Sequence, residues 1–455
     1  MSVCFICRGN ANSSLRNDGI RSLLRLLALV VLVSVSTVAV PAFAQAAGVS
    51  ATGEQRGVRV GGLSFWPALF LEGRYDSNVF RENEVENPVA APMLRIRPGL
   101  SFSNKKGRSY VARFGVIGDI RVYMSDNENV KAQGRYGAEG QAGIDFMPKG
   151  LLKIGLFDNF KRHLDSPTTA TNRTMDGIDN TAGVRFSLRP GGTELRKPLN
   201  FTVGYANRLQ VFDEAEDLNA AEHRAFFKFV WLFLPKTSLV FDGSYAYYGY
   251  AAEGARPGPD LHNSTPSRFM AGIDGLITRK LAVVLKGGYG MSGHSEGDVY
   301  EDYLAQTTLV FSPSATSVFS TGWVRNFRNS PVGNFLATHD FKVQGDIRMM
   351  QRVQTQLMAT YSLVDYGKYD PIAEGDNVEV TPENGLRADQ VLRLSATAGF
   401  DIFRFIGVSL GYNLEQLASN YELRPLPDPV TGLKGKDDYA SYVRHIVFAS
   451  LDIRY

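Results

Sequence analysis

The chain has 455 residues, including 45 glycines, 20 tyrosines and 28 phenylalanines, and its formal net charge is +3 at pH 7. A charge this small, with no clustered basic face and no recognisable binding motif, argues against a nucleic-acid-binding protein. The two cysteines, Cys4 and Cys7, both lie close to the N-terminus. A disulfide framework or a thiol catalyst is therefore not expected in the rest of the chain.

The N-terminal segment has the pattern of a secretory signal peptide. Arginines up to Arg25 precede the short apolar run Leu26–Val40, which Pro41 ends, and Ala42-Phe43-Ala44 then supplies an A-x-A cleavage site. A run of about 15 residues is short for a transmembrane helix. We therefore expect a Sec-type signal peptide that is cleaved near Ala44.

From about residue 66 onward one pattern recurs, in which roughly 10–14 residues alternate with period two and are followed by a turn. In Ser109–Met124 the even-numbered positions are apolar or small, whereas the odd-numbered positions include Arg113, Asp119 and Arg121. Period two indicates a β-strand. Strands of this length are longer than those of soluble sandwiches, and when tilted they are long enough to cross a bilayer.

The connections between these segments alternate in length. Pro148–Gly150 and Thr278–Lys280 are short turns, whereas Asp76–Ala91 and Gly367–Gly385 are long polar loops. Short periplasmic turns and long external loops are typical of outer-membrane barrels. We predict an all-β fold, a transmembrane antiparallel β-barrel of about 18 strands (about 16 to 20) in the outer membrane of a Gram-negative bacterium. A soluble β-helix or sandwich would leave the signal peptide and the loop pattern unexplained.

The segment His445–Tyr455 is a long amphipathic strand that ends on an aromatic residue. In a closed barrel the last strand pairs with the first, because an open edge in lipid would leave backbone groups unsatisfied. This ending resembles the C-terminal signature of bacterial outer-membrane proteins, which implies insertion by the outer-membrane barrel assembly machinery. We expect a signal peptide over residues 1–44, a short periplasmic segment over residues 45–62 and the barrel, surrounded by outer-membrane lipid, over residues 63–455.

The inward faces of the predicted strands carry many charges. A barrel of this size holds water and passes solute, and the excess of basic side chains favours an anionic passenger. Pairing of both signs into salt-bridge networks that stiffen the wall explains the pattern equally well. The predicted pore-lining residues are Arg95, Arg97, Arg113, Asp119, Arg121, Arg135, Glu139, Lys153, Arg185, Arg208, Lys286, Arg348, Arg393, Arg444 and Arg454.

Four aromatic residues, Tyr123, Phe226, Tyr248 and Tyr442, also fall on the inward register. Rings that line a polar lumen would stack on the faces of sugars and let a chain slide. Packing against a plug or a folded-in loop is the competing explanation. A register error of one residue would turn such rings toward lipid instead.

The sequence gives little support for catalysis. A barrel enzyme would need a histidine with a serine or aspartate partner near the rim. His294 is flanked by serines in Ser292–Ser295, but a Gly/Ser loop explains that pattern equally well. Metal-ligand spacings and phosphate-binding glycine loops do not occur. We expect no enzyme activity, no cofactor and no metal; a lipid-acting outer-membrane enzyme or an adhesin barrel is the less favoured alternative.

The first predicted strand ends in Tyr75-Asp76-Ser77-Asn78-Val79-Phe80. Asp76 and Asn78 suit a turn from strand to loop, because Asx side chains bond to nearby backbone. Following a signal peptide and opening a barrel of this size, the Y-D-S-N-V-F stretch resembles a family of β-barrel porins found in bacterial polysaccharide loci.

That resemblance implies a passive conduit for an exopolysaccharide or capsular polysaccharide, which would work with a separate periplasmic polysaccharide-export protein. It implies no catalytic residue. The alternative is a general diffusion porin, or one selective for anions or oligosaccharides. Both functions would use the charged lumen, so the sequence alone leaves the passenger open.

Overall fold

The computed structural model describes residues 58–60, 62–82, 88–104, 109–164, 176–191, 198–213, 216–251, 262–330, 333–350, 352–367, 378–381, 387–425, 438–439 and 441–454. The predicted signal peptide over residues 1–44 lies outside these ranges, as does Tyr455. The first barrel strand begins at Leu63.

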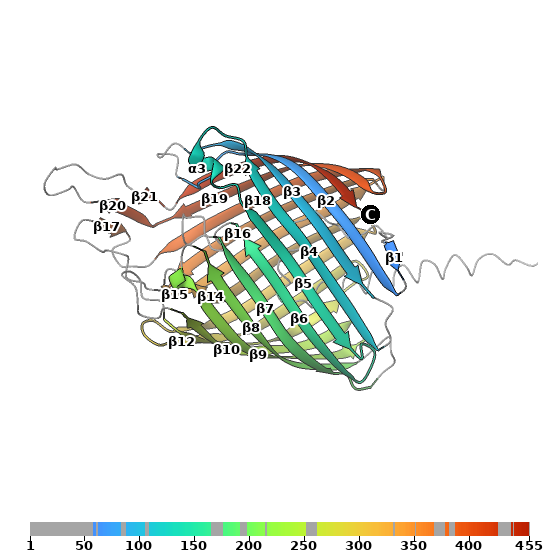
Figure 1. The fold of residues 1–455 in the computed structure, drawn as a ribbon. Helices are drawn as coiled ribbons and strands as arrows, with labels where there is room; N and C mark the ends of the chain where they lie inside the picture. Colours follow the sequence, from blue (N-terminus) through green and yellow to red (C-terminus); the bar gives the residue numbers. More distant parts are fainter. Residues whose placement is uncertain are drawn as a thin grey trace, which may run out of the picture. The chain divides into compact units, whose positions relative to one another are not determined.

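Long antiparallel strands form a closed barrel in the described part of the chain (Figure 1). The sheet contains 19 strands, of which one is the short β1 (Val58–Val60), so 18 strands build the wall. The predicted fold class and strand number are confirmed. The wall strands are β2 (Leu63–Asp76), β3 (Ala91–Ser103), β4 (Tyr110–Tyr123), β5 (Tyr136–Phe146), β6 (Leu152–His163), β7 (Gly177–Leu188), β8 (Leu199–Phe212), β9 (Ala220–Leu234), β10 (Thr237–Tyr250), β11 (Ser264–Leu276), β12 (Leu281–His294), β13 (Tyr300–Ser314), β14 (Ser317–Ser330), β15 (Gly333–Met349), β16 (Val353–Tyr366), β18 (Ala388–Phe403), β19 (Ile406–Ser419) and β22 (Tyr442–Arg454).

The remaining elements are short and lie in the connections or at the chain's entry to the barrel. A helical turn α3 (Glu128–Lys131) follows β4, and a 3-10 turn η2 (Glu216–Leu218) follows β8. Strands β17 (Val378–Thr381), β20 (Glu422–Pro425) and β21 (Asp438–Tyr439) form a separate three-stranded sheet within two of the long connections. No helix in the described residues is long and apolar enough to span a membrane.

The first and last wall strands close the barrel. Strand β2 pairs with β22 from Ala68 opposite Arg454 to Asp76 opposite Ile446. Because all backbone groups in lipid must be bonded internally, this pairing removes the exposed edge that an open sheet would present. The predicted pairing of the first and last strands is confirmed.

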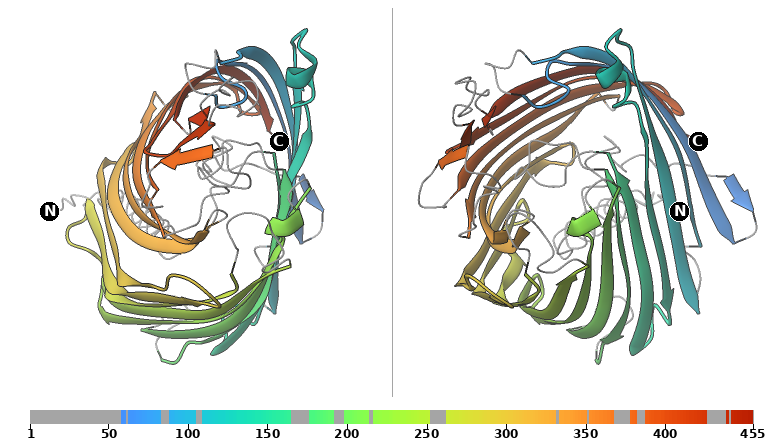
Figure 2. Two further views of the ribbon diagram at one scale, coloured as in Figure 1. Left: turned by 90° about the vertical axis from the view of Figure 1, so that its left-hand side faces the viewer. Right: turned by 60° about the vertical axis from the view of Figure 1, so that its left-hand side comes forward.

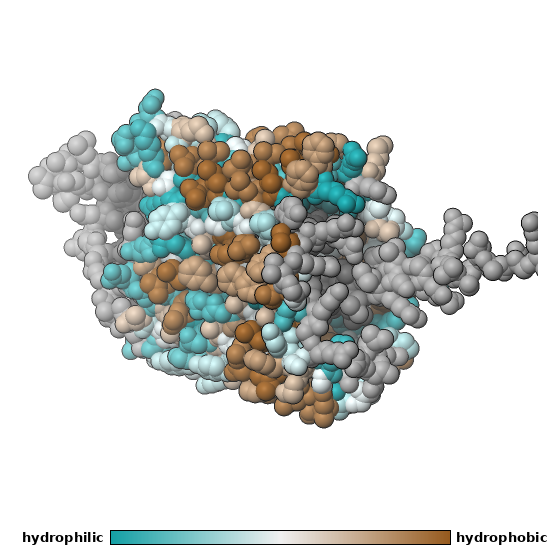
Figure 3. Space-filling model, turned by 45° about the vertical axis from the view of Figure 1, so that its right-hand side comes forward, coloured by the Kyte–Doolittle hydropathy of each residue, from teal (hydrophilic) through white to brown (hydrophobic). Residues whose placement is uncertain are grey.

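The outer surface of the wall is apolar over most of its height, and Figure 3 shows hydrophobic side chains spread across the strands. Most exposed tyrosines lie toward the long-loop end, including Tyr75, Tyr247, Tyr289 and Tyr303, whereas Tyr110 lies at the short-turn end. Exposed Phe146, Phe201, Trp231, Phe319 and Phe403 lie toward the short-turn end. An apolar band between two aromatic girdles is the outer surface of a barrel that spans a membrane. This chain is therefore an outer-membrane-type β-barrel.

Several inward aromatic rings pack over glycines of the neighbouring strand. Phe448 on β22 covers Gly411 on β19, and Phe226 on β9 covers Gly204 on β8. Built side chains at these glycines would overlap the rings. The missing Cβ thus lets a large ring pack against the wall instead of projecting into the lumen.

Replacing Gly411 with alanine is expected to destabilise the barrel by about 1–3 kcal/mol, because the added carbon displaces the Phe448 ring. Unfolding by guanidinium in lipid vesicles measures the change. Gly287→Ala is the matched control, since no atom lies within 4 Å of a Cβ built there. Equal effects of the two changes, or an undiminished Gly411→Ala effect in a Phe448→Ala background, would contradict this packing role.

Candidate functional site

The lumen is enclosed by alternate side chains of every wall strand, and Figure 2 looks along it. The predicted pore-lining residues that belong to strands all lie on this inward register. The strand pairings fix the register from β2 to β13 and from β15 back to β2. Arg135 lies just before β5, where its Nη1 is 2.6 Å from Oδ2 of Asp176. The lumen wall is the candidate functional site.

A single carboxylate near the short-turn end holds three cations from three neighbouring strands. Asp145 on β5 is 3.0 Å from Lys153 Nζ on β6, 3.1 Å from Arg185 Nη2 on β7 and 3.7 Å from Arg113 Nη1 on β4. The Arg113 side chain is 62% exposed, whereas that of Asp145 is 5% exposed. This group, the Asp145 cluster, therefore presents positive charge to the lumen while its one carboxylate is covered.

A second group, the Asp119 cluster, lies on the adjoining strands β3 and β4. Arg95 donates two hydrogen bonds to Asp119, from Nε at 2.5 Å and from Nη2 at 2.7 Å. Arg121 Nη2 donates to Oδ2 of the same carboxylate at 3.0 Å. Two guanidinium groups thus share one carboxylate, and the paired fork geometry holds Arg95 in a fixed orientation.

The two clusters belong to one side of the barrel on which basic residues predominate. On strands β3–β7 the inward register carries seven basic residues against four acidic ones, an excess of three. The basic residues are Arg95, Arg97, Arg113, Arg121, Lys153, Lys161 and Arg185, and the acidic residues are Asp119, Glu139, Asp145 and Asp179. This side is called the basic wall below. A one-sided excess in a water-filled lumen raises the local concentration of anions.

The other predicted pore-lining residues are held mostly in pairs. Lys286 Nζ is 2.8 Å from Asp242, and Arg208 is paired with Asp179. Further pairs are Glu139 with Lys161 at 3.6 Å, Arg348 with Asp401 at 3.9 Å and Arg454 with Asp452 at 2.5 Å, while Arg97 is buried. The salt-bridge networks and the basic excess therefore coexist in one wall.

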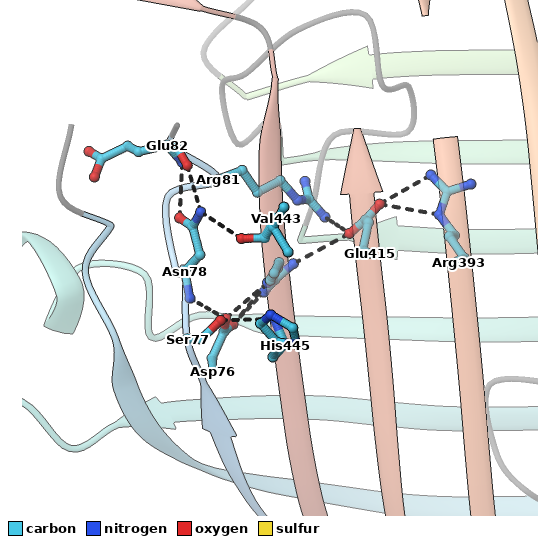
Figure 4. A network of polar contacts seen from close by, with 10 residues as sticks. Asp76, Ser77, Asn78, Arg81, Glu82, Arg393, Glu415, Val443 and His445 are labelled. Atoms are coloured by element: carbon cyan, nitrogen blue, oxygen red, sulfur yellow. Dashed lines mark hydrogen bonds and ion pairs between the residues drawn. The ribbon is translucent and has the colours of Figure 1, made fainter. Parts of the chain in front are cut away.

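The Y-D-S-N-V-F segment forms a polar network across the closing seam (Figure 4). Arg444 on β22 donates to Asp76 from Nε at 3.0 Å and from Nη2 at 2.5 Å. Asn78 Nδ2 donates to the carbonyl of Val443 at 3.1 Å, and the Ser77 amide donates to the carbonyl of His445 at 3.0 Å. This group, the seam clasp, extends the contact between β2 and β22 beyond the last pair of the ladder.

Glu415 on β19 links the seam clasp to the rest of the lumen. Its Oε1 accepts from Arg393 Nη2 on β18 at 3.1 Å, and its Oε2 lies 3.7 Å from Arg81 and 4.0 Å from Arg444. From the sequence, Asp76 and Asn78 were expected only to form a local turn, and Glu415 was not among the predicted pore-lining residues. Asp76 alternates with Glu72 and Arg74 along β2, so the same alternation that places those two residues inward could have placed Asp76 in the lumen.

Three of the four aromatic residues proposed for sugar stacking are buried. Tyr123, Tyr248 and Tyr442 are 8%, 9% and 5% exposed, and Tyr248 donates to Gln210 Oε1 at 2.7 Å. The Phe226 ring lies over Gly204. The stacking role stays a prediction.

In the described part of the chain, His294 contacts the backbone at the start of β15. Its Nε2 lies 3.1 Å from the carbonyl oxygen of Asn334, which is a structural contact between two hairpins. Within the described ranges, histidine, cysteine, aspartate and glutamate side chains form no group of three that would hold a metal ion.

Comparisons with known proteins find similarity in fold only. No family model and no curated protein sequence matches the chain. OccAB4 from Acinetobacter baumannii aligns at 8% identity with a TM-score of 0.46, covering 88% of this chain and 99% of that chain. The outer membrane protein OpdK from Pseudomonas aeruginosa aligns at 8% identity with a TM-score of 0.43, covering 86% and 99%. The ferric enterobactin receptor PfeA from the same organism aligns at 8% identity with a TM-score of 0.43, covering 88% and 82%. The family resemblance of Tyr75–Phe80 therefore stays a prediction.

Proposed function

We propose that this barrel is a passive outer-membrane channel that favours anionic solutes. The observation that carries the proposal is the basic wall, and in particular the Asp145 cluster, where three cations surround one covered carboxylate. Fixed positive charge on the lumen wall concentrates anions and excludes cations without any chemical step. The channel has no need of a catalytic group or a cofactor, and lipid contacts only its outer face.

Planar bilayers test the proposal directly. With purified barrel and a KCl gradient across the membrane, the reversal potential is expected to have the sign of chloride preference, and the preference is expected to shrink as salt screens the wall charges. Channels without ion preference, channels that prefer potassium or a protein that never conducts would each contradict it.

Export of an acidic polysaccharide is the second candidate, and it rests on the Y-D-S-N-V-F resemblance together with the basic wall. An acidic polymer would move past the same basic side chains as a small anion. Synthesis in the inner membrane would set the direction of its movement. It would require a periplasmic polysaccharide-export protein as partner, and the barrel assembly machinery for insertion. Neither partner contact is part of the structure described above.

A deletion strain distinguishes the two candidates. Export predicts loss of surface-bound and secreted polysaccharide, with recovery when the wild-type gene is restored. Small-solute diffusion predicts normal polymer together with slower uptake of small anions. Complementation with a gene that lacks the three cations of the Asp145 cluster then shows whether either phenotype depends on the basic wall.

A further inference from the structure

The pairing of β13 with β14 stops before either strand ends, at the long-loop end of β14. Strands β13 and β14 pair from Ser314 opposite Ser317 to Ala305 opposite Arg325, and the pairing stops there. Strand β13 nevertheless continues to Tyr300, and β14 continues to Ser330 while still paired with β15. Residues 326–330 have therefore separated from β13 without leaving β15.

The separated end lies on the inner face of the wall. The Phe327 ring stacks on Tyr300 of β13 with centroids 4.2 Å apart, and the Arg268 guanidinium of β11 lies 4.1 Å from its centroid. A Cβ built at Gly290 of β12 would lie 2.5 Å from the same ring. Because Arg268 and Gly290 both face the lumen, the end of β14 crosses over β12 and β13 into the lumen. Phe327 is 2% exposed in this position.

Three side chains on β10 and β11 hold it there. Arg268 Nη2 donates to the carbonyl of Phe327 at 2.7 Å, Ser264 Oγ accepts from Asn329 Nδ2 at 2.8 Å, and the Tyr250 hydroxyl donates to the carbonyl of Ser330 at 3.1 Å. Two of these bonds end on carbonyls of β14. These three hydrogen bonds, called the latch below, replace part of the ladder that β13 no longer supplies.

On both separated edges, a backbone amide donates a hydrogen bond to the side chain of the residue before it. The Tyr303 amide donates to Oδ1 of Asp302 at 2.7 Å, and the Phe327 amide donates to Oδ1 of Asn326 at 2.8 Å. Asp and Asn side chains offer the backbone this local alternative to a ladder bond. The folded-in position is therefore bonded at both edges and is not a frayed end, since buried amides are rarely left unpaired.

The register fixes where the end would go if it returned to the wall. Continuing the pairing of Ala305 with Arg325 puts Tyr303 opposite Phe327 and Glu301 opposite Asn329. Phe327 would then turn from the lumen to the outer face, beside the exposed Tyr303. The latch bonds, each of which uses a side chain, would be exchanged for backbone ladder bonds to β13, so the strand end has two alternative sets of hydrogen-bond partners.

We propose that the end of β14 is a gate of the channel. Folded in and latched, it narrows the lumen at the long-loop end; paired with β13, it completes the wall and widens the lumen. The gate rests on the proposed channel function, because narrowing matters only if solute passes.

Cysteine pairs test the gate, since the sequence has no cysteine beyond Cys7. Ser264→Cys with Asn329→Cys, joined by a short reagent with two thiol-reactive groups, such as a bis-methanethiosulfonate, fixes the latched position. Glu301→Cys with Asn329→Cys, joined by the same reagent, fixes the returned position. Both pairs share Asn329→Cys, which alone is the control for loss of its bond to Ser264.

Two measurements are made on each pair, the cross-linked fraction by mass spectrometry and the single-channel conductance in bilayers. Both pairs are expected to cross-link, with loss of most of the conductance in the latched form and none in the returned form. Failure of the Glu301 pair to cross-link where the Ser264 pair succeeds would overturn the movement, and equal conductance of the two linked forms would overturn the gate. Absence of conductance in every form contradicts the channel function instead, and the cross-linking still tests the movement.

Discussion

Asp76→Ala is expected to destabilise the folded barrel by about 3–5 kcal/mol, the loss typical when one partner of a buried ion pair is removed. The side chains of Arg444 and Asp76 are only 9% and 1% exposed. Alanine would leave the guanidinium covered after removing the carboxylate to which it donates, while the Glu415 carboxylate lies farther away, at 4.0 Å. Guanidinium unfolding in lipid vesicles, together with heat-modifiable gel mobility, measures the loss.

Two controls separate the ion pair from general damage. The double variant Asp76→Leu with Arg444→Met is expected to recover most of the lost stability, because replacing both buried charges by apolar groups is often neutral. Asp452→Ala breaks an ion pair within β22, between side chains that are 11% and 20% exposed, and is expected to cost less than Asp76→Ala. If Asp452→Ala matched Asp76→Ala, or the double variant fell below both single variants, the clasp would not be what stabilises the seam.

The triple variant Arg113→Gln, Lys153→Gln, Arg185→Gln is expected to lower the anion preference of the channel by about sevenfold. It changes the formal charge of the Asp145 cluster from three cations and one anion to a lone carboxylate. A change of about 1 kT in local potential alters anion and cation concentrations in opposite directions, which gives about sevenfold in their ratio. Reversal potentials in a salt gradient measure it.

The opposite substitution in the same cluster provides an internal check. Asp145→Asn removes the only carboxylate of the cluster and is expected to raise the anion preference. Arg348→Gln, on β15 and 3.9 Å from Asp401, removes a lumen cation outside the basic wall and is expected to have a smaller effect than the triple variant. Shifts of the same sign for Asp145→Asn and the triple variant would show that charge at this cluster does not set selectivity.

The strands and their two faces could be predicted because alternation is a local property. In residues 110–123 every even-numbered position is apolar or small, so the direction of Arg113 and Arg121 followed from parity alone. The partners could not be predicted in the same way. Asp145 contacts cationic side chains from three other strands. Which side chains meet depends on the stagger of the whole sheet, and no short segment of sequence encodes that stagger.

Two further features of the structure could not be predicted from the alternation of the strands. Phe448 packs on Gly411 because the strand pairing sets them opposite one another, although 37 positions separate them in the sequence (448 − 411). Phe327 lies over the inner face although the alternation of β14 assigns its position to the outer face, because its ladder to β13 has ended. Parity predicts a direction only while the neighbouring strand remains paired.

The seam clasp has a consequence for the order of events in folding. Asp76 and Arg444 are 368 positions apart, so their contact forms only after the strands between them are in place. Contacts of such long sequence separation form slowly and late. A late contact affects the rate of unfolding more than the rate of folding. The clasp therefore acts as a kinetic lock: once the last strand has docked, it is expected to lengthen the lifetime of the closed barrel without speeding its assembly.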